Sequence, residues 1–367
     1  MVEASIGTDR TAAPAQAVLA RRERIGVRIL ALSAIALLAA TIGSITIGPT
    51  GISLPDAVTI YDAARSGHWT DGAKRAYLVL VDLRLPRTLI GAFVGAALAV
   101  SGAMLQGLFR NPLADPGIVG VSAGGALAAI AAIALGDGIL RLWHELFGIY
   151  AIPLAAFCGS LAATFLLVAI AERQGRLMVG TLLLAGIAVG AFAAALSGLI
   201  AYASDDRELR DLTLWTMGSL SGATWAKVAG IAPFSIALVI ALPMIVRALN
   251  GLLLGEMEAF NLGVNVQRFK LAIVALSAAA AGASVAVAGL VGFVGIVIPH
   301  FIRLIAGPDH RVLLPASAMA GGAILLLADI LARIVVSPAE LPIGIIMALI
   351  GAPVFLHLVL NRRATGI

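Results

Sequence analysis

The stretch RLPRTLIGAFVGAALAVSGAMLQGLFRNPLADPG, residues 84–117, is enough to assign the class of this protein. Two arginines three residues apart open it, and more than twenty uncharged residues follow before Arg110. An apolar run of about twenty residues can cross the hydrocarbon core of a bilayer as one helix. Proline is excluded from a regular helix interior, so the turn NPLADPG ends the run. The stretch predicts a membrane-spanning helix between a basic end and a tight turn.

The composition of the whole chain agrees with this prediction. Of its 367 residues, 60% are hydrophobic and 12% charged, and the mean hydropathy is +1.03. Soluble domains are about 45–50% apolar and about 25% charged. The 40 glycines allow membrane helices to pack closely. A porin-like barrel is excluded, because its strands would alternate polar and apolar residues over about ten positions. We therefore expect an all-α polytopic membrane protein in a lipid bilayer.

Ten apolar spans divide the chain. They are expected at residues 29–48, 86–108, 117–135, 148–171, 180–203, 229–248, 270–291, 293–306, 312–336 and 342–361. The third and eighth are short or interrupted by Gly and Pro, which predicts tilted or broken helices. Residues 29–361 thus form one membrane domain between tails at 1–28 and 362–367. Because no short apolar stretch with a cleavage site precedes the first span, residues 1–28 are interpreted as a cytoplasmic tail.

The basic residues predict the orientation. With the N-terminus inside, 15 of the 25 Lys and Arg residues fall on inner segments and 10 on outer ones. An even number of spans places both termini on the same side of the membrane. The bias in basic residues favours the cytoplasm as that side. It also accounts for the net charge of +5 without nucleic-acid binding. The segments GAALAVSG (Gly95–Gly102) and GASVAVAG (Gly282–Gly289) match at five of eight positions in spans of opposite direction. They indicate either inverted halves or a chance match between small-residue segments.

Three arginines lie at predicted outer ends of spans. Arg84 and Arg87 precede the second span, and Arg333 ends the ninth, one helical turn after Asp329. They could anchor the protein at the interface, or Arg333 could pair with Asp329. Basic clusters on the outer face would also suit docking of an acidic soluble partner, because arginine binds carboxylates in a bidentate manner.

The inner side carries the longest predicted cytoplasmic loop, about residues 249–269. Its segment LLLGEMEAFNLG has apolar residues at helical spacing and a glycine stop at Gly263. Helices that lie on a membrane surface are usually rich in Lys and Arg. This one carries Glu256 and Glu258, which favours a protein partner. The turns NPLADPG and GRLMVGTLLLAG (Gly175–Gly186) are either plain turns or a flexible constriction of a path.

Several kinds of site are missing from the sequence. The five histidines show no metal-binding spacing, and Cys158 is the only cysteine. No GxxxxGK[ST] loop occurs, so the chain does not hydrolyse ATP in the P-loop manner. Carboxylates are nearly missing from span centres, where ion-coupled carriers usually keep them. We therefore expect the energy for any transport to come from another subunit.

The chain resembles the permease subunits of ABC importers for iron-siderophores, haem and cobalamin. The resemblance rests on residues 84–125 and on GEMEAFNLGV, GLVGFVGIVIPHFIRLIAGPDHRVLLP, LLLADILAR and AELPIGIIMALIGAPVFL, and covers residues 29–361. The segment DDRELRDLTLWTMGSLSGATW (Asp205–Trp225) is most similar to the haem branch. The resemblance implies the type II importer fold, with ten helices per subunit and a homodimer with the path at its interface. It places the protein in the bacterial inner membrane.

The resemblance also implies partners and sites. Two ATPase subunits would bind ATP and Mg, and this chain would bind no cofactor. A periplasmic binding protein would deliver haem or another iron chelate. The implied residues are Arg84, Arg87 and Arg333 for binding-protein docking, Asn111, Leu113, Val179 and Gly180 for the cytoplasmic gate, and Leu254, Gly255, Glu256, Ala259, Leu262 and Gly263 for ATPase coupling. In the cobalamin branch the second gate turn carries hydroxyl side chains, whereas this chain has Met178, Val179 and Gly180 there.

Three alternatives stay open from the sequence. Within the importer class, the cargo could be a ferric siderophore or cobalamin. A secondary transporter or channel would work without nucleotide and would place a charged residue near the middle of the bilayer. A membrane scaffold would need no gate.

Overall fold

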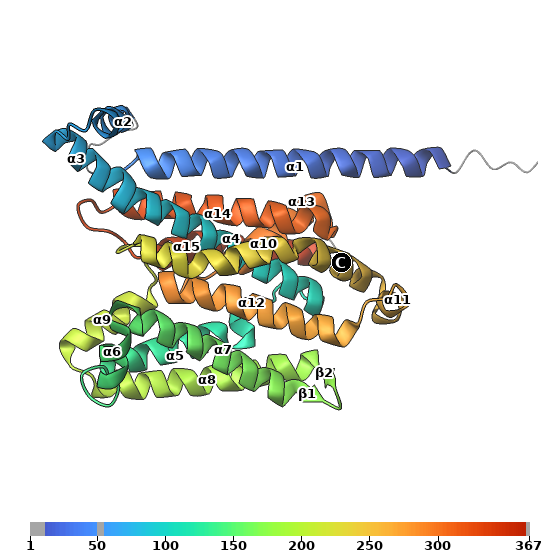
Figure 1. The fold of residues 1–367 in the computed structure, drawn as a ribbon. Coiled ribbons are helices and arrows are strands. Elements are labelled where there is room, and N and C mark those ends of the chain that lie inside the picture. Colours follow the sequence, from blue (N-terminus) through green and yellow to red (C-terminus); the bar gives the residue numbers. More distant parts are fainter. Residues whose placement is uncertain (1–11, 50–54, 365–367) are drawn as a thin grey trace, which may run out of the picture.

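The computed structural model describes residues 12–49 and 55–364 as a bundle of long helices with short connecting elements (Figure 1). Ten helices correspond to the ten predicted spans: α1 (Ala12–Thr46), α4 (Leu85–Phe109), α5 (Val121–Ala134), α7 (Ala151–Ala171), α8 (Val179–Ala203), α10 (Trp225–Leu254), α12 (Val266–Ala288), α13 (Val294–Ala306), α14 (His310–Ile334) and α15 (Ile343–Ala364). The prediction of an all-helical membrane fold is confirmed.

Shorter elements connect these helices. They are α2 (Asp56–Ser66), α3 (Asp71–Tyr77), the π-helical turn η1 (Leu78–Arg84), the 3-10 turns η2 (Pro116–Val119) and η3 (Gly148–Tyr150), α6 (Arg141–Phe147), the hairpin β1 (Glu172–Arg173) with β2 (Arg176–Leu177), α9 (Asp206–Thr216) and α11 (Glu256–Asn261). An Asp205–Glu208 capping box begins α9, because each side chain bonds the other residue's backbone amide.

Not every span is long enough to cross a bilayer by itself. Seven helices meet that length in the described residues, while α5, α13 and the apolar part of α15 are shorter. With 14 and 13 residues, α5 and α13 are about 20 Å long against a hydrocarbon core of about 30 Å. The prediction that the third and eighth spans are short is therefore confirmed.

The bundle has two distinct ends (Figure 1). Helices α2, α3, α6 and α9 lie at one end, called here the outer end. The hairpin β1–β2 and α11 lie at the opposite, inner end, where α1 begins and α15 finishes. This shared location agrees with an even number of spans. Helix α1 begins at Ala12, so residues 12–28 of the predicted tail continue the first span as helix, whereas residues 1–11 and 365–367 lie outside the described residues.

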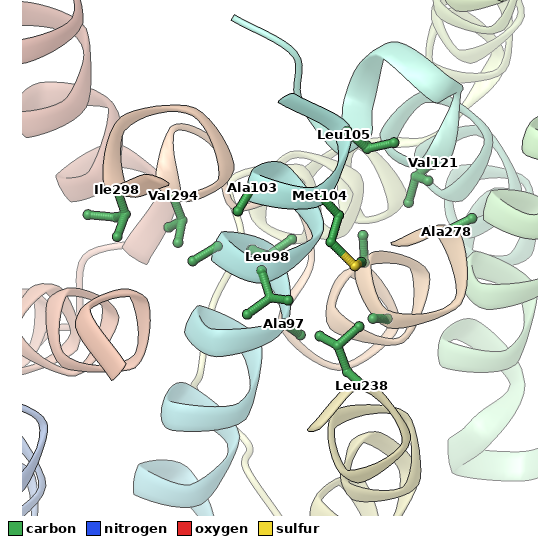
Figure 2. Close-up of a cluster of buried hydrophobic side chains, with 14 of the residues drawn as sticks. Ala97, Leu98, Ala103, Met104, Leu105, Val121, Leu238, Ala278, Val294 and Ile298 are labelled. Carbon is green, nitrogen blue, oxygen red and sulfur yellow. The ribbon is translucent and has the colours of Figure 1, made fainter. Parts of the chain in front are cut away.

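Helix α4 is the centre of the bundle. It packs against α10, α12, α13 and α14, and Figure 2 shows Ala97, Leu98 and Met104 of α4 among side chains from α10, α12 and α13. Two glycines permit this packing. A Cβ atom at Gly95 would meet the backbone of Gly321 on α14, and one at Gly102 would meet the backbone of Gly295 on α13. Helix α4 thus sits within backbone contact of two neighbours, as small residues allow in membranes.

The two similar glycine-rich segments run in opposite directions. Gly95–Gly102 lies in α4, which runs from the outer to the inner end, and Gly282–Gly289 lies in α12, which runs back (Figure 1). Their helices also pack against each other. This arrangement has the opposed directions that inverted halves require.

Candidate functional sites

The three predicted docking arginines meet at the outer end of α4 and α14. The Arg87 guanidinium donates to both oxygens of Asp329, at 2.9–3.1 Å, and to both oxygens of Glu340, at 2.9 and 3.0 Å. Arg333 lies on the other side of Asp329, with Nε 3.2 Å from its carboxylate. The sequence-based pairing of Asp329 with Arg333 is confirmed, and Asp329 bridges two guanidinium groups that are far apart in sequence.

Two of these arginines also cap helix α1. Arg84 Nη1 donates to the carbonyls of Ile45 and Thr46, at 2.6 and 3.1 Å. Arg333 Nη1 donates to the carbonyls of Ser44 and Ile47, at 3.3 and 3.2 Å. The last carbonyls of a helix have no partner within the helix and carry a partial negative charge. Arg84 and Arg333 satisfy them and tie α1 to the core.

The exposure of these side chains separates their roles. Arg84 and Arg333 are 5% and 4% exposed, so both are buried in the single chain. The Arg87 side chain is 14% exposed and its partner Glu340 is 35% exposed. The structure brings the three arginines together at one place and gives them internal partners, of which the sequence indicated only Asp329 for Arg333. Docking of a soluble partner stays a prediction, with Arg87 and Glu340 as the accessible part of the cluster.

The first predicted gate turn, residues 110–117, is held by its own polar groups. Asn111 Oδ1 accepts a 3.0 Å hydrogen bond from the Leu113 amide, and Leu113 is 40% exposed. Asp115 Oδ1 accepts from the Gly117 amide at 2.7 Å and caps η2. Desolvation raises the pKa of the Asp115 carboxyl, and the bond from Gly117 opposes that rise. The turn is a defined structure with one exposed apolar side chain at its tip.

The second predicted gate turn begins α8 beside the hairpin β1–β2. Val179 is half-buried and Gly180 is exposed, with open space where its Cβ would be. The Leu177 amide donates to Gln267 Oε1 of α12 at 3.1 Å and fixes the hairpin. In the described part of the chain, no hydrogen bond joins Asn111 or Leu113 to Val179 or Gly180. Their closure as one gate stays a prediction.

The predicted coupling loop folds as expected. Helix α10 ends at Leu254, Gly255 turns the chain at φ 140°, and the short helix α11 stops before Gly263, at φ +84°. Ala259 is buried and packs α11 onto the bundle. Glu256 pairs with the buried Lys270 at 2.8 Å. The apolar residues of this loop instead face solvent; Leu254, Met257, Phe260 and Leu262 are 57–71% exposed. A loop with this many exposed apolar side chains is typical of a protein contact.

One link between these sites was missed in the sequence. Arg110 caps α4 in the left-handed region at φ 49°, and its Nη2 donates to the Leu252 carbonyl at 2.6 Å. Leu252 lies in the last turn of α10, directly before α11. Arg110 therefore joins the first gate turn to the root of the coupling loop. The only available signal was a single charge after the apolar span, and its partner is 142 residues away.

Helix α8 presents a wide apolar face to the surroundings. Four of its large side chains, Leu184, Ile187, Phe192 and Leu199, are 64–70% exposed. In its most apolar stretch of 18 residues, only 11% are buried inside the chain. The corresponding share is 78% for the span that contains α4. This face is available to lipid, to a second copy or to a path.

The histidines do not assemble a metal site. Among the described residues, no group of three His, Cys, Asp or Glu side chains could hold a metal ion. His300, which follows Pro299 in α13, is buried. His310 begins α14 and contacts Asn250 Oδ1 of α10 through its Nδ1, at 2.8 Å. The contact joins the inner ends of α10 and α14.

Comparisons with known proteins agree with this geometry. The sequence profile of the FecCD transport family matches residues 32–361. The cobalamin import system permease protein BtuC of Halobacterium salinarum is 44% identical, over 80% of this chain and 76% of that protein. The hemin transport system permease protein HmuU of Yersinia pestis is 43% identical, over 78% of this chain and 84% of that protein. The vitamin B12 import system permease protein BtuC of Shigella boydii is 42% identical, over 94% of this chain and 98% of that protein.

A solved structure shares the fold. It is a metal-chelate type ABC transporter in an inward-facing conformation, 33% identical to this chain, with a TM-score of 0.73. The match covers 91% of this chain and 99% of that one. The resemblance in sequence therefore extends to the arrangement of the helices.

Proposed function

The chain belongs to the FecCD transport family of ABC-importer permeases, and we propose that it moves haem from a periplasmic binding protein into the cytoplasm, driven by ATP hydrolysis on partner subunits. The exposed apolar loop around α11 carries this proposal. The chain has no P-loop of its own, and α11 offers apolar side chains at one end of the bundle where a soluble subunit can bind. Movement of α11 would reach the first gate turn through the Leu252–Arg110 bond.

A second copy is the proposed occupant of the α8 face. Small residues on a membrane helix favour helix–helix contact because they let two backbones approach closely, and large apolar side chains around them can then pack against the partner. Helix α8 has such residues, and Gly190 and Gly198 have open space around them. A homodimer through α8 would place two apolar walls around a central path. The turn at Val179 and Gly180 would then lie at the inner mouth of that path.

Docking of the binding protein is proposed at the outer arginine cluster. Acidic side chains of that protein would meet Arg87 first, because Arg87 and Glu340 are the accessible members. Arg84 and Arg333 would hold the platform through their bonds to α1. The inner end, with α11 and both described chain ends, would then lie in the cytoplasm of a bacterial inner membrane.

Haem is the preferred cargo for two reasons. The sequence of segment 205–225, which forms α9 and its flanks at the outer end, resembles the haem branch, and a hemin permease is among the relatives. An apolar wall with few polar groups also suits a large amphipathic cargo. Cobalamin is the alternative, because relatives at 42–44% identity are named for it, and a ferric siderophore is the other.

An uptake assay in proteoliposomes tests the proposal. The chain would be reconstituted with its ATPase and binding protein, and uptake of haem, one ferric siderophore and cobalamin compared. We expect ATP-dependent uptake, greatest for haem. The double variant Met257→Ser, Phe260→Ser should lose ATPase association and uptake. The matched control Leu146→Ser, Ile149→Ser changes two exposed apolar residues at the outer end and should leave ATPase association intact. Uptake without ATP would favour a secondary transporter and overturn the proposal.

A further inference from the structure

Two adjoining grooves surround Arg247 near the inner end of α10. One lies between α10 and α12 and includes Arg268 and Phe269. The other lies between α10 and the start of α14 and includes Arg311. Arg247, Leu262 and Val264 line both grooves, so the two are parts of one surface. Each groove holds a pair of arginines from helices that are distant in sequence.

The surface is strongly basic. None of the residues that line either groove is acidic. The three arginine side chains are exposed, and no ion pair among the described residues includes them.

Of the carboxylates on the adjacent segments, Asp309 and Glu256 already have partners, and Glu258 forms no ion pair with any of the three arginines in the described residues. Asp309 Oδ1 accepts from Asn250 Nδ2 and from the Arg311 amide, at 2.8 and 2.9 Å. Glu256 is paired with Lys270. The guanidinium groups are therefore available to an anion from outside the chain.

An apolar ridge on α10 leads away from this surface toward the bilayer centre. Ile236, Val239, Ile240 and Met244 are 52–74% exposed. Their spacing of three and four residues places them along one side of the helix. The first three also line an apolar groove that α10 forms with α4 and α14, with Leu37 of α1 at its edge. Eleven residues separate Ile236 from Arg247, about 16 Å along a helix, which is close to half of a hydrocarbon core of about 30 Å.

We propose that Arg247, Arg268 and Arg311 bind the phosphate headgroup of an anionic phospholipid whose acyl chain lies along the α10 ridge. Basic pockets between membrane helices at the bilayer surface bind such headgroups. The combination of arginines with an apolar ridge of half-bilayer length selects a lipid. A free phosphate would use only the arginines, and an acidic protein surface could not cover the ridge inside the bilayer. The bound lipid joins α10, α12 and α14 around the root of α11. This inference requires a membrane protein but not the proposed transport function.

Native mass spectrometry of the delipidated full chain tests the site. Phosphatidylglycerol and cardiolipin serve as anionic probes, with phosphatidylcholine and inorganic phosphate as comparisons. The test variant is Arg247→Gln, Arg268→Gln, Arg311→Gln. The matched control Arg65→Gln, Arg207→Gln, Arg210→Gln removes the same charge from exposed arginines at the outer end. Each single substitution and the triple Arg→Lys variant are measured alongside, so that the test does not depend on the folding of one protein.

We expect anionic lipid to bind the wild-type chain more tightly than phosphatidylcholine. Each arginine removed should weaken binding about fivefold, and the outer control should bind as wild type. The Arg→Lys variant keeps the charge and should retain most of the affinity. Equal binding by the triple Gln variant, or equal binding of phosphatidylcholine, overturns the site. Competition by millimolar inorganic phosphate would reassign it to free phosphate. Loss of ATPase association with unchanged lipid binding would reassign it to the partner subunit.

Discussion

Helices α4 and α8 have nearly the same composition and opposite surroundings. Each has 25 residues, and their spans have similar hydropathy. Yet 78% of the most apolar 18-residue stretch in the span of α4 is buried in the chain, against 11% for the same length in α8. The glycines differ in their contacts. Gly95 and Gly102 of α4 lie against the backbones of α14 and α13, whereas in α8 Gly190 and Gly198 face open space and Gly186 alone meets a neighbouring backbone, at the Ile118 carbonyl. Hydropathy marks a membrane span, and close backbone contact makes one span the core.

The ends of the two helices differ as well. Helix α4 is tied at its outer end by the Arg87–Asp329 pair and at its inner end by the Arg110–Leu252 bond. The start of α8 is held through the hairpin before it, by the bond from the Leu177 amide to Gln267 Oε1 of α12. A fixed central helix together with a peripheral helix that exposes most of its surface suits the proposed path between two subunits. Four substitutions test this difference, from the largest expected effect to the smallest.

The largest effect is expected for Gly102→Leu in α4. The new side chain would meet the Gly295 carbonyl, and backbone cannot move aside, so we expect a loss of about 3 kcal/mol or more. The matched control is Gly198→Leu in α8, where an added Cβ has no neighbouring atom within 4 Å. Yield of monodisperse protein and thermal unfolding in detergent measure both. Equal stability of the two variants would contradict the contrast between the helices.

The next effect concerns the outer tie of α4. Asp329→Ala leaves the buried Arg333 and the half-buried Arg87 without their shared carboxylate, and the buried charge should cost about 3–5 kcal/mol. The control Glu145→Ala breaks the exposed Arg141–Glu145 pair, at 2.8 Å, and should cost less than about 1 kcal/mol. Thermal unfolding compares the two. A small loss for Asp329→Ala would show that the cluster is solvated and not a structural tie.

A smaller effect, on association alone, is expected for Phe192→Asn in α8. If α8 forms the dimer contact, loss of this aromatic anchor should weaken the dimer by about 2 kcal/mol, roughly 30-fold. Monomer unfolding should change little, because Phe192 is 65% exposed. Phe165→Asn on α7 is the control, since Phe165 is 76% exposed on a different helix. Dimer dissociation can be measured by crosslinking or light scattering. If both variants dissociate equally, the interface lies elsewhere.

The last substitution, Arg110→Gln, should act on coupled uptake more than on the fold. It removes one charged hydrogen bond to the Leu252 carbonyl, worth about 1.5–3 kcal/mol at most. We expect the ATPase to bind as before while ATP-driven uptake falls, because the gate turn loses its tie to the loop. Arg173→Gln in the β1–β2 hairpin is an exposed control at the same end. Normal uptake by Arg110→Gln would show that coupling does not pass through this bond.

Much of the fold could be predicted from local patterns. Apolar length located all ten spans, and the glycine that closes LLLGEMEAFNLG located the end of α11. The pairing of Asp329 with Arg333 followed from helical spacing. The partners of Arg84 and Arg87 could not be predicted in this way. Arg84 caps a helix about forty residues earlier, and Arg87 binds carboxylates more than 240 residues later.

The sequence by itself determined that this chain is a multi-span helical membrane protein of one transporter family, because apolar runs of bilayer length and ordered motifs are local properties. Only the tertiary structure decided which of the similar helices is central, which arginines are buried, and that Arg110 joins the gate turn to the coupling loop. The physical reason is that hydropathy is nearly equal among the spans. Backbone contacts at single glycines and hydrogen bonds between distant residues therefore select the arrangement.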